Sequence, residues 1–257
     1  MPAPRPPHPD QSMTEFLTVT SICKSFGALR AIQDLSFTLK KGEILGIAGP
    51  NGSGKSTLFN ILTKIPFGPD RGEVTLDGAS LSRLSARGIV HAGLVRIFQT
   101  ETDFETLSVI ENILLSLPDA DYRRGREAAE ERALELLDYV DLKPQRDRIA
   151  SEITVYDRKK LMIATALACR PKVLLLDEPA AGLSRPEIEQ MVGLIRRINA
   201  DGVSIIVIEH IISLLVSVSN RLLVLNFGEL LVEGAPEDVI RDPRVVEAYL
   251  GSAAAHG

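Results

Sequence analysis

The sequence has 257 residues, of which 45% are hydrophobic, values that suit one large α/β domain or a core domain with a small insertion. Its formal net charge is −5, from 29 basic and 34 acidic residues, and aromatic residues make up only 5%. Because no basic stretch dominates, the composition argues against nucleic acid as a partner.

The two ends of the chain and its cysteines limit the cellular setting. Residues 1–14 are rich in proline and have no apolar core, which excludes a secretory signal and predicts a disordered tail. No apolar run approaches the roughly 18 residues that span a bilayer, so we expect at most a peripheral place at a membrane. Cys23 and Cys169 lie far apart and outside any CxxC pattern, which predicts reduced thiols in the cytoplasm.

The apolar pattern predicts strands and helices along the chain. Apolar–polar alternation predicts two antiparallel strands with one exposed face, Phe16–Thr20 and Leu35–Leu39. Nearly continuous aliphatic runs predict strands buried on both faces, as in a parallel sheet covered by helices: Ile44–Ala48, Val173–Leu176, Val203–Ile208 and Leu222–Leu225. Helices are predicted at Lys55–Thr63, Glu127–Val140, Pro186–Asn199 and Ile211–Ser217.

A glycine-rich segment between a predicted strand and a predicted helix fills the pattern GxxxxGK[ST], in the context that this phosphate-binding motif requires. Its residues are Gly49, Pro50, Asn51, Gly52, Ser53, Gly54, Lys55, Ser56 and Thr57. Glycines let backbone amides approach phosphate closely, and the helix that follows adds a positive dipole end. We therefore predict that the segment binds ATP, with Lys55 on the β- and γ-phosphates and Ser56 as a ligand of Mg²⁺.

Two carboxylates follow the aliphatic run Val173–Leu176. Asp177, at the carboxyl end of a buried strand, is predicted to face Mg²⁺. Glu178 is then placed to act as the general base that activates water for attack on the γ-phosphate. Either residue alone could be an ordinary helix cap, but with the phosphate-binding segment they predict a phosphoryl-transfer site.

The order of these motifs resembles that of ATP-binding-cassette (ABC) ATPases, over about residues 15–250. Gln99 matches the family's Q-loop, residues 181–184 its D-loop, and His210 its switch histidine. The resemblance implies that Gln99 senses Mg²⁺ and the attacking water, that His210 contacts the γ-phosphate, and that Phe26 stacks on adenine. The expected catalytic residues are Glu178, His210 and Gln99. The expected metal ligands are Ser56, Gln99 and Asp177.

The same resemblance implies an α/β fold, with a P-loop NTPase core of the RecA-like type, an N-terminal antiparallel β subdomain and a helical insertion. Its sheet would be mostly parallel. We expect a nucleotide-binding core of residues 15–98 and 168–251, a helical subdomain of residues 99–167, and tails of residues 1–14 and 252–257.

Three stretches resemble the ATPases of branched-chain amino acid importers in particular: residues 93–99, 177–183 and 246–251. Such importers place two different ATPase chains beneath two membrane permease subunits, and a periplasmic binding protein feeds them. The resemblance implies a peripheral ATPase at the cytoplasmic face of the inner membrane that drives amino acid import. Its expected partners are the permeases and a second ABC ATPase chain, in a heterodimer or alternatively a homodimer, with the binding protein as an indirect partner.

One motif departs from the family pattern. The signature LSGGQ falls on residues 153–157, where Thr154 keeps a hydroxyl, Val155 and Tyr156 replace both glycines, and Asp157 replaces the glutamine. In the family this segment faces the γ-phosphate held by the other chain, so added side chains and a negative charge would weaken that contact. Two alternatives stay open: an ATPase of a non-import ABC system, such as a lipid-extraction motor, and a nucleotide-binding subunit that hydrolyses weakly.

Overall fold

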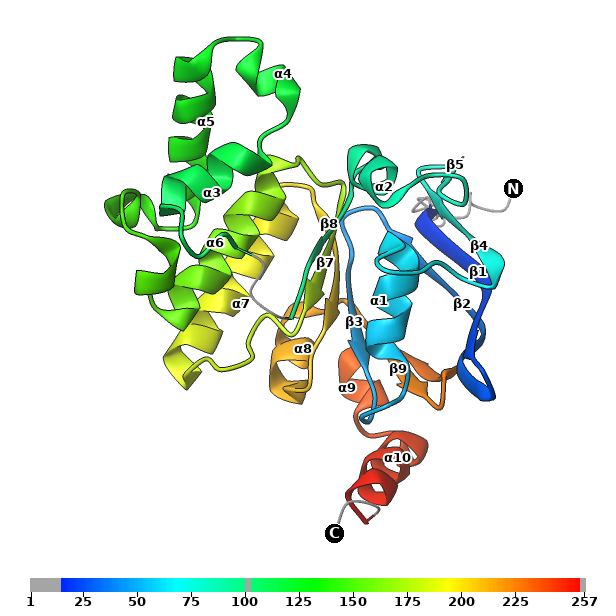
Figure 1. Ribbon diagram of the computed structural model, residues 1–257. Coiled ribbons are helices and arrows are strands. Elements are labelled where there is room, and N and C mark those ends of the chain that lie inside the picture. The colour runs from blue at the N-terminus through cyan, green and yellow to red at the C-terminus, as the bar shows by residue number, and fades with distance from the viewer. Residues whose placement is uncertain (1–14, 100–102, 255–257) are drawn as a thin grey trace, which may run out of the picture.

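The computed structural model describes residues 15–99 and 103–254, and the side chains within these ranges up to residue 250. The tail expected at residues 1–14 lies outside the described ranges. Two sheets and the helices around them make up the body of the molecule, and a group of helices lies at one end of it (Figure 1). Among the described residues, no helix is long and apolar enough to cross a membrane.

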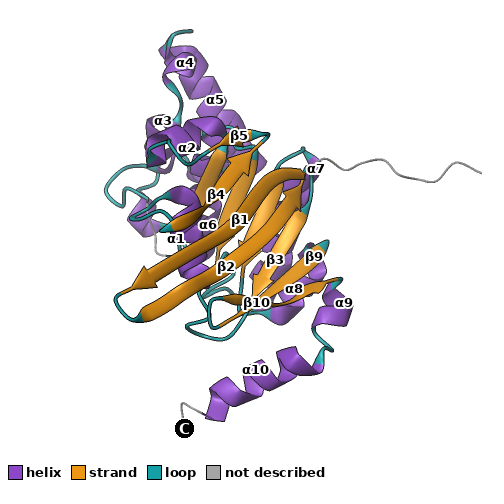
Figure 2. Cartoon of the chain, turned by 90° about the vertical axis from the view of Figure 1, so that its right-hand side faces the viewer, coloured by secondary structure: helices purple, strands orange, loops and turns teal. Residues whose placement is uncertain are grey.

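The N-terminal sheet is antiparallel, as predicted, and its strand order is β2-β1-β4-β5. Its strands are β1 (Glu15–Phe26), β2 (Leu29–Lys40), β4 (Arg71–Leu76) and β5 (Ala79–Ser80). The first two are longer than the sequence predicted, because β1 passes register irregularities without leaving the sheet. Figure 2 shows this sheet lying across the strands of the second sheet.

The second sheet has the strand order β10-β9-β3-β8-β7-β6 and is parallel except for β10, which pairs antiparallel with β9. Its strands are β3 (Ile44–Ala48), β6 (Leu94–Ile97), β7 (Val173–Asp177), β8 (Ser204–Ile208), β9 (Arg221–Asn226) and β10 (Glu229–Gly234). The four predicted buried runs are therefore confirmed as strands. The pattern missed β6, which is short and contains an arginine, and β10, which is a largely exposed edge strand.

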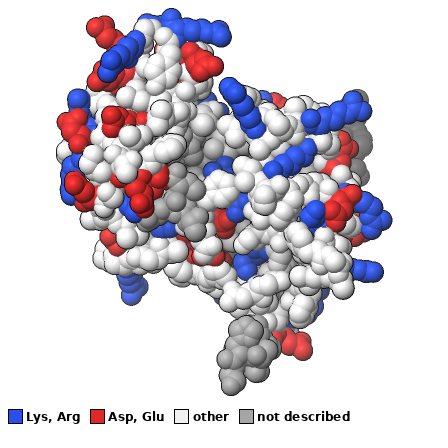
Figure 3. All heavy atoms as spheres, in the orientation of Figure 1, with Lys and Arg blue, Asp and Glu red and all other residues white. Residues whose placement is uncertain are grey.

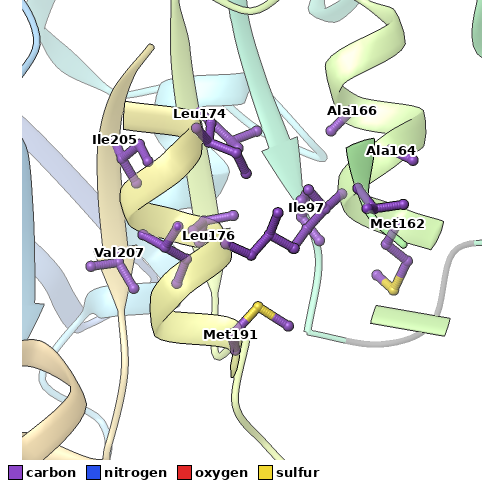
Figure 4. Close-up of a cluster of buried hydrophobic side chains, with 14 of the residues drawn as sticks. Ile97, Met162, Ala164, Ala166, Leu174, Leu176, Met191, Ile205 and Val207 are labelled. Carbon is purple, nitrogen blue, oxygen red and sulfur yellow. The ribbon is translucent and has the colours of Figure 1, made fainter. Parts of the chain in front are cut away.

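The parallel strands are buried on both faces, and successive side chains enter two different cores. In β3, for example, Leu45 and Ile47 pack with α1 and the antiparallel sheet, whereas Ile44 and Ala48 face the opposite core. Figure 4 shows Leu174 and Leu176 of β7 in that opposite core, with Leu176 on the side of Met191. This two-sided burial is why the strands read as continuous aliphatic runs.

The helices follow the predictions to within two residues at the four predicted places. They are α1 (Lys55–Thr63), α2 (Ala86–Ala92), α3 (Val109–Ser116), α4 (Asp119–Tyr122), α5 (Arg126–Tyr139), α6 (Val155–Ala168), α7 (Arg185–Ala200), α8 (Ile212–Val218), α9 (Pro236–Val239) and α10 (Pro243–Ala254). The group at one end of the molecule contains α3, α4, α5 and α6 (Figure 1). Helix α10 continues through residues 252–254, which we expected to be tail.

The topology decides where the functional segments meet. The strands β3, β8, β7 and β6 are parallel neighbours, so their carboxyl ends lie along one edge of the sheet. The predicted phosphate-binding loop follows β3, the paired carboxylates end β7, His210 follows β8 and Gln99 follows β6. Ligands of open α/β sheets bind at this kind of edge.

Candidate active site

The loop between β3 and α1 is held by its own lysine. The Lys55 ammonium donates to the carbonyl oxygens of Gly49 at 2.7 Å and Pro50 at 2.9 Å. Helix α1 begins at Lys55 after Gly54, whose φ of 106° is accessible to glycine and strained for other residues. Burial lowers the pKa of Lys55, and the nearby Glu178 and Asp177 carboxylates counter part of that shift. The loop is therefore preformed, with its cation close to two acids.

A cavity of about 740 Å³ opens over this loop. The loop lines it from Asn51 to Thr57, and β1 and β2 contribute Phe26, Leu29 and Gln33. The remaining lining residues are Arg30, Ala31, Glu178, His210 and Phe227. Its size and mixture of apolar walls with a few polar groups are typical of a small-molecule site. Gly49 and Pro50 do not line the cavity.

Glu178 is the meeting point of the three residues expected to be catalytic. Gln99 donates from its side-chain amide to one carboxylate oxygen of Glu178 at 2.6 Å, and the His210 ring nitrogen lies 3.0 Å from the other oxygen. Glu178 itself has a φ of 50°, an uncommon backbone angle for this residue type, and its amide donates to the Ile208 carbonyl on β8. Residues far apart in sequence thus converge on one carboxylate.

Asp177 is paired with an arginine that the sequence analysis assigned no role. One Asp177 oxygen accepts from Arg96 at 2.6 Å, and both side chains are buried. The guanidinium also donates to Asn60 at 2.7 Å and lies near the faces of the Phe59 and Phe98 rings. Burial raises the pKa of the Asp177 carboxyl, and Arg96 counters part of that shift. In the sequence, the feature that pointed to Arg96 was an arginine inside a short apolar run.

The donor set near Asp177 fits a bound Mg²⁺. The second oxygen of Asp177, Oδ1, is buried and has no hydrogen-bond partner among the described residues. The same is true of the Ser53 hydroxyl in the loop. Such orphaned oxygens are costly unless a ligand satisfies them. No cluster of three or more acidic, histidine or cysteine side chains suited to a metal occurs in the described part of the chain. A hydroxyl, one or two carboxylate oxygens and substrate phosphates are what Mg²⁺ ordinarily uses.

Glu209 is a second residue beside the site to which the sequence analysis assigned no role. Its side chain is only 2% exposed, and its carboxylate accepts from the amides of Ala180 at 2.7 Å and His210 at 3.0 Å. Burial raises the pKa of Glu209, and these amide donors counter part of that shift. The carboxylate thereby fixes the segment after Glu178 to the residue that contacts Glu178. The sequence signal for Glu209 was an acidic residue directly after an aliphatic run.

Replacing Glu209 with glutamine is expected to destabilise the protein by about 1–3 kcal/mol and to slow ATP hydrolysis, since an amide NH₂ cannot accept from both backbone donors. Thermal melting and phosphate release would be measured, with Glu127→Gln, an exposed acid on α5, as the matched control. Equal melting temperature and turnover in the two variants would show that Glu209 holds neither segment.

The altered signature forms the start of α6. Thr154 is the N-cap, and its hydroxyl oxygen accepts from the Asp157 amide at 3.1 Å. The Asp157 carboxylate turns inward, with Gln145 at 2.8 Å and Lys160 at 2.9 Å, so its charge is already neutralised within the chain. The expectation that Asp157 opposes a phosphate held by the other chain stays a prediction. Tyr156 is partly buried against the core, whereas Val155 is 49% exposed at the helix start.

The fold and this site define the class of protein. The sheet is mostly parallel, a GxxxxGK[ST] loop follows one strand, and paired carboxylates lie at the end of another. This combination is typical of P-loop nucleotide-binding proteins. Comparison with known proteins narrows the class. The family model for "ABC transporter" matches residues 32–181, and the chain belongs to this family, whose cassettes are the ATPases of transporters. A second model, "Branched-chain amino acid ATP-binding cassette transporter", matches residues 229–255.

Individual relatives resemble the chain along its length. It is 36% identical to the high-affinity branched-chain amino acid transport ATP-binding protein LivG of Salmonella typhimurium, over 92% of this chain and 98% of that protein. It is 30% identical to the lipopolysaccharide export system ATP-binding protein LptB of Escherichia coli, over 91% and 97%. Among solved structures, the ADP conformation of MJ1267, an ATP-binding cassette of an ABC transporter, matches with a TM-score of 0.84 and 30% identity, over 93% and 99%.

Proposed function

We propose that this chain is the ATP-binding and ATP-hydrolysing subunit of an ABC importer for branched-chain or related amino acids. The observation that carries the proposal is the match of residues 229–255 to the branched-chain amino acid cassette model, because this segment lies outside the residues that match the general ABC transporter model. The similarity to LivG over nearly the whole chain supports the same assignment.

In the proposed reaction Glu178 takes a proton from water as the water oxygen bonds to the γ-phosphorus, while the bond from that phosphorus to the bridging β-phosphate oxygen breaks and ADP leaves. Gln99 and His210 orient that carboxylate and the water, since both lie within hydrogen-bond distance of it. Phe26, which lines the cavity, stacks on adenine.

The phosphates would be held by the loop that follows β3. Lys55 exchanges the Gly49 and Pro50 carbonyls for the β- and γ-phosphates, and loop amides face the phosphate oxygens. Ser56, Gln99 and Asp177 are the proposed ligands of Mg²⁺. When bound, Mg²⁺ neutralises the charge that develops on the phosphates during transfer.

We further propose that the chain pairs with a second ABC ATPase chain beneath two membrane permease subunits at the cytoplasmic face of the inner membrane. A periplasmic binding protein would deliver the solute. The resemblance to importer ATPases supports these partners. The mixed charge of the surface is compatible with protein partners: on the face shown in Figure 3, acidic and basic side chains are interspersed.

Reconstitution with the permease subunits in lipid vesicles tests this function. We expect ATP hydrolysis to rise when binding protein loaded with leucine, isoleucine or valine is added, and to stay at its basal rate with unloaded binding protein. The 30% identity to LptB makes lipid extraction the second candidate. If ATP hydrolysis responds to lipopolysaccharide and to no amino acid, the import function is wrong and lipid extraction is the function of this chain.

The signature leads to a prediction about asymmetry between the two ATPase chains. The exposed Val155 side chain occupies the position of a signature glycine, so this chain alone should hydrolyse ATP slowly. A partner chain with an intact LSGGQ should restore one active site, built from this chain's Lys55, Glu178 and His210. The competing possibility is that the Thr154 hydroxyl and the amides at the start of α6 suffice.

Two matched variants decide between these possibilities. Glu178→Gln in this chain should remove nearly all turnover of the mixed dimer, whereas the equivalent change in the partner should remove little. Losses of equal size would show that the two sites are equally active and that the altered signature is harmless.

A further inference from the structure

A hydrogen bond joins the C-terminal helix to the phosphate-binding loop. The Gly49 amide donates to the hydroxyl oxygen of Tyr249 on α10 at 2.8 Å, across 200 residues of sequence. Helix α10 lies next to the end of the molecule at which the chain turns from β3 into α1 (Figure 1). Its first turn is anchored by Val245, which is buried in the core, and Tyr249 follows one helical turn later on the same face.

Gly49 is buried, and there is no room for a side chain on it. A Cβ at this position would lie 2.3 Å from the Leu225 carbonyl oxygen and 2.7 Å from the Ser53 hydroxyl, and the φ of 148° disfavours other residue types. Its carbonyl oxygen accepts from Lys55. The residue is buried, so an amide without a protein acceptor would be poorly hydrated. Tyr249 and Lys55 therefore hold opposite ends of the same residue.

We infer that Tyr249 is a positioning residue of the ATP site, which fixes the first peptide of the phosphate-binding loop so that the amides after it are aligned before nucleotide binds. The inference rests on the proposed role of the Gly49–Thr57 loop in binding ATP. Without the hydroxyl, the buried Gly49 amide has to find another acceptor, and the loop shifts to do so. Nucleotide binding then has to realign the loop, and the free energy that this requires weakens the affinity for nucleotide.

The test is Tyr249→Phe, which keeps the ring and its packing and removes the hydroxyl that accepts from the Gly49 amide. We expect the Kd values for ATP and ADP both to rise by roughly tenfold, the size of effect typical of one buried donor left unpaired. The kcat at saturating ATP should stay within about twofold while KM rises, because the group acts on binding. Leu250→Ala is the matched control, since Leu250 is the next residue of α10 and is 67% exposed.

Fluorescent-nucleotide titration, steady-state kinetics and hydrogen exchange of the peptide that contains Gly49 would be measured on the same preparations. Faster exchange of that peptide together with weaker nucleotide binding is the expected result. Unchanged Kd and exchange in Tyr249→Phe, even with a lowered melting temperature, would overturn the inference and leave Tyr249 a purely structural contact. If the unmodified chain binds no nucleotide, or binds it as well after Lys55→Ala, the ATP-site assignment itself fails, and the inference with it.

Discussion

Replacing Glu178 with glutamine is expected to slow ATP hydrolysis by about 10²–10⁴-fold while ATP binding persists, since an amide keeps the shape of the side chain but cannot take a proton. The surroundings tolerate the change. Gln99 can turn its own amide to accept from the new NH₂, and the His210 ring can adopt the tautomer that donates. The fold should therefore remain intact, and nucleotide-dependent dimers should last longer. Phosphate release in single-turnover conditions and an ATP titration would be measured together.

The control for this experiment is Glu189→Gln, an exposed acid on α7 whose nearest basic partner is 3.9 Å away. Its turnover should match that of the unmodified chain. If the Glu178→Gln variant also hydrolyses ATP at the normal rate, the general base is another residue. The hydrogen bonds around Glu178 would then serve only to position side chains.

Replacing Lys55 with alanine is expected to raise the Kd for ATP by roughly 10- to 100-fold, because charged hydrogen bonds to phosphate are lost. The free energy of unfolding should change little. Burial lowers the pKa of Lys55 below its unfolded value, so its charged form is disfavoured in the folded state and gives no net stability at neutral pH. For the unmodified chain, the same sign predicts that this group's contribution to stability increases as pH rises between the folded and unfolded pKa values.

Isothermal titration with ATP and thermal melting would test the lysine variant. Lys143→Ala is the control, because it removes one positive charge from an exposed side chain outside the residues that line the cavity. Tight ATP binding by Lys55→Ala would contradict the assignment of the loop. A large fall in melting temperature would instead mean that the two carbonyl contacts of Lys55 matter more for the fold than its buried charge costs.

Much of the candidate site could be predicted because most of its residues lie in short segments with recognisable patterns. The Gly49–Thr57 loop, the pair Asp177 and Glu178, and His210 each follow a strand whose burial on two faces makes it a continuous aliphatic run. The carboxyl ends of neighbouring parallel strands lie together, so recognising the strands was enough to expect these residues at one edge.

The contacts that complete the site involve pairings that no local pattern encodes. Arg96 lies in a strand too short to recognise, and its partner Asp177 is 81 residues away. Glu209 could have been a helix cap, and only packing shows that its carboxylate accepts amides on both sides of the site. Asp157 faces inward because Gln145 and Lys160 lie beside it, which the departure from LSGGQ could not indicate.

The sequence by itself determined the fold class, the mostly parallel character of the buried sheet, the phosphate-binding loop and the family to compare. Periodicity and glycine spacing are local properties, and the backbone obeys them wherever the segment lies. Only the tertiary structure decided which oxygens of Asp177 and Glu178 are occupied, where the signature's charge points, and that Tyr249 on the last helix reaches Gly49. These are hydrogen bonds between buried groups distant in sequence, and their partners are fixed by how the layers pack.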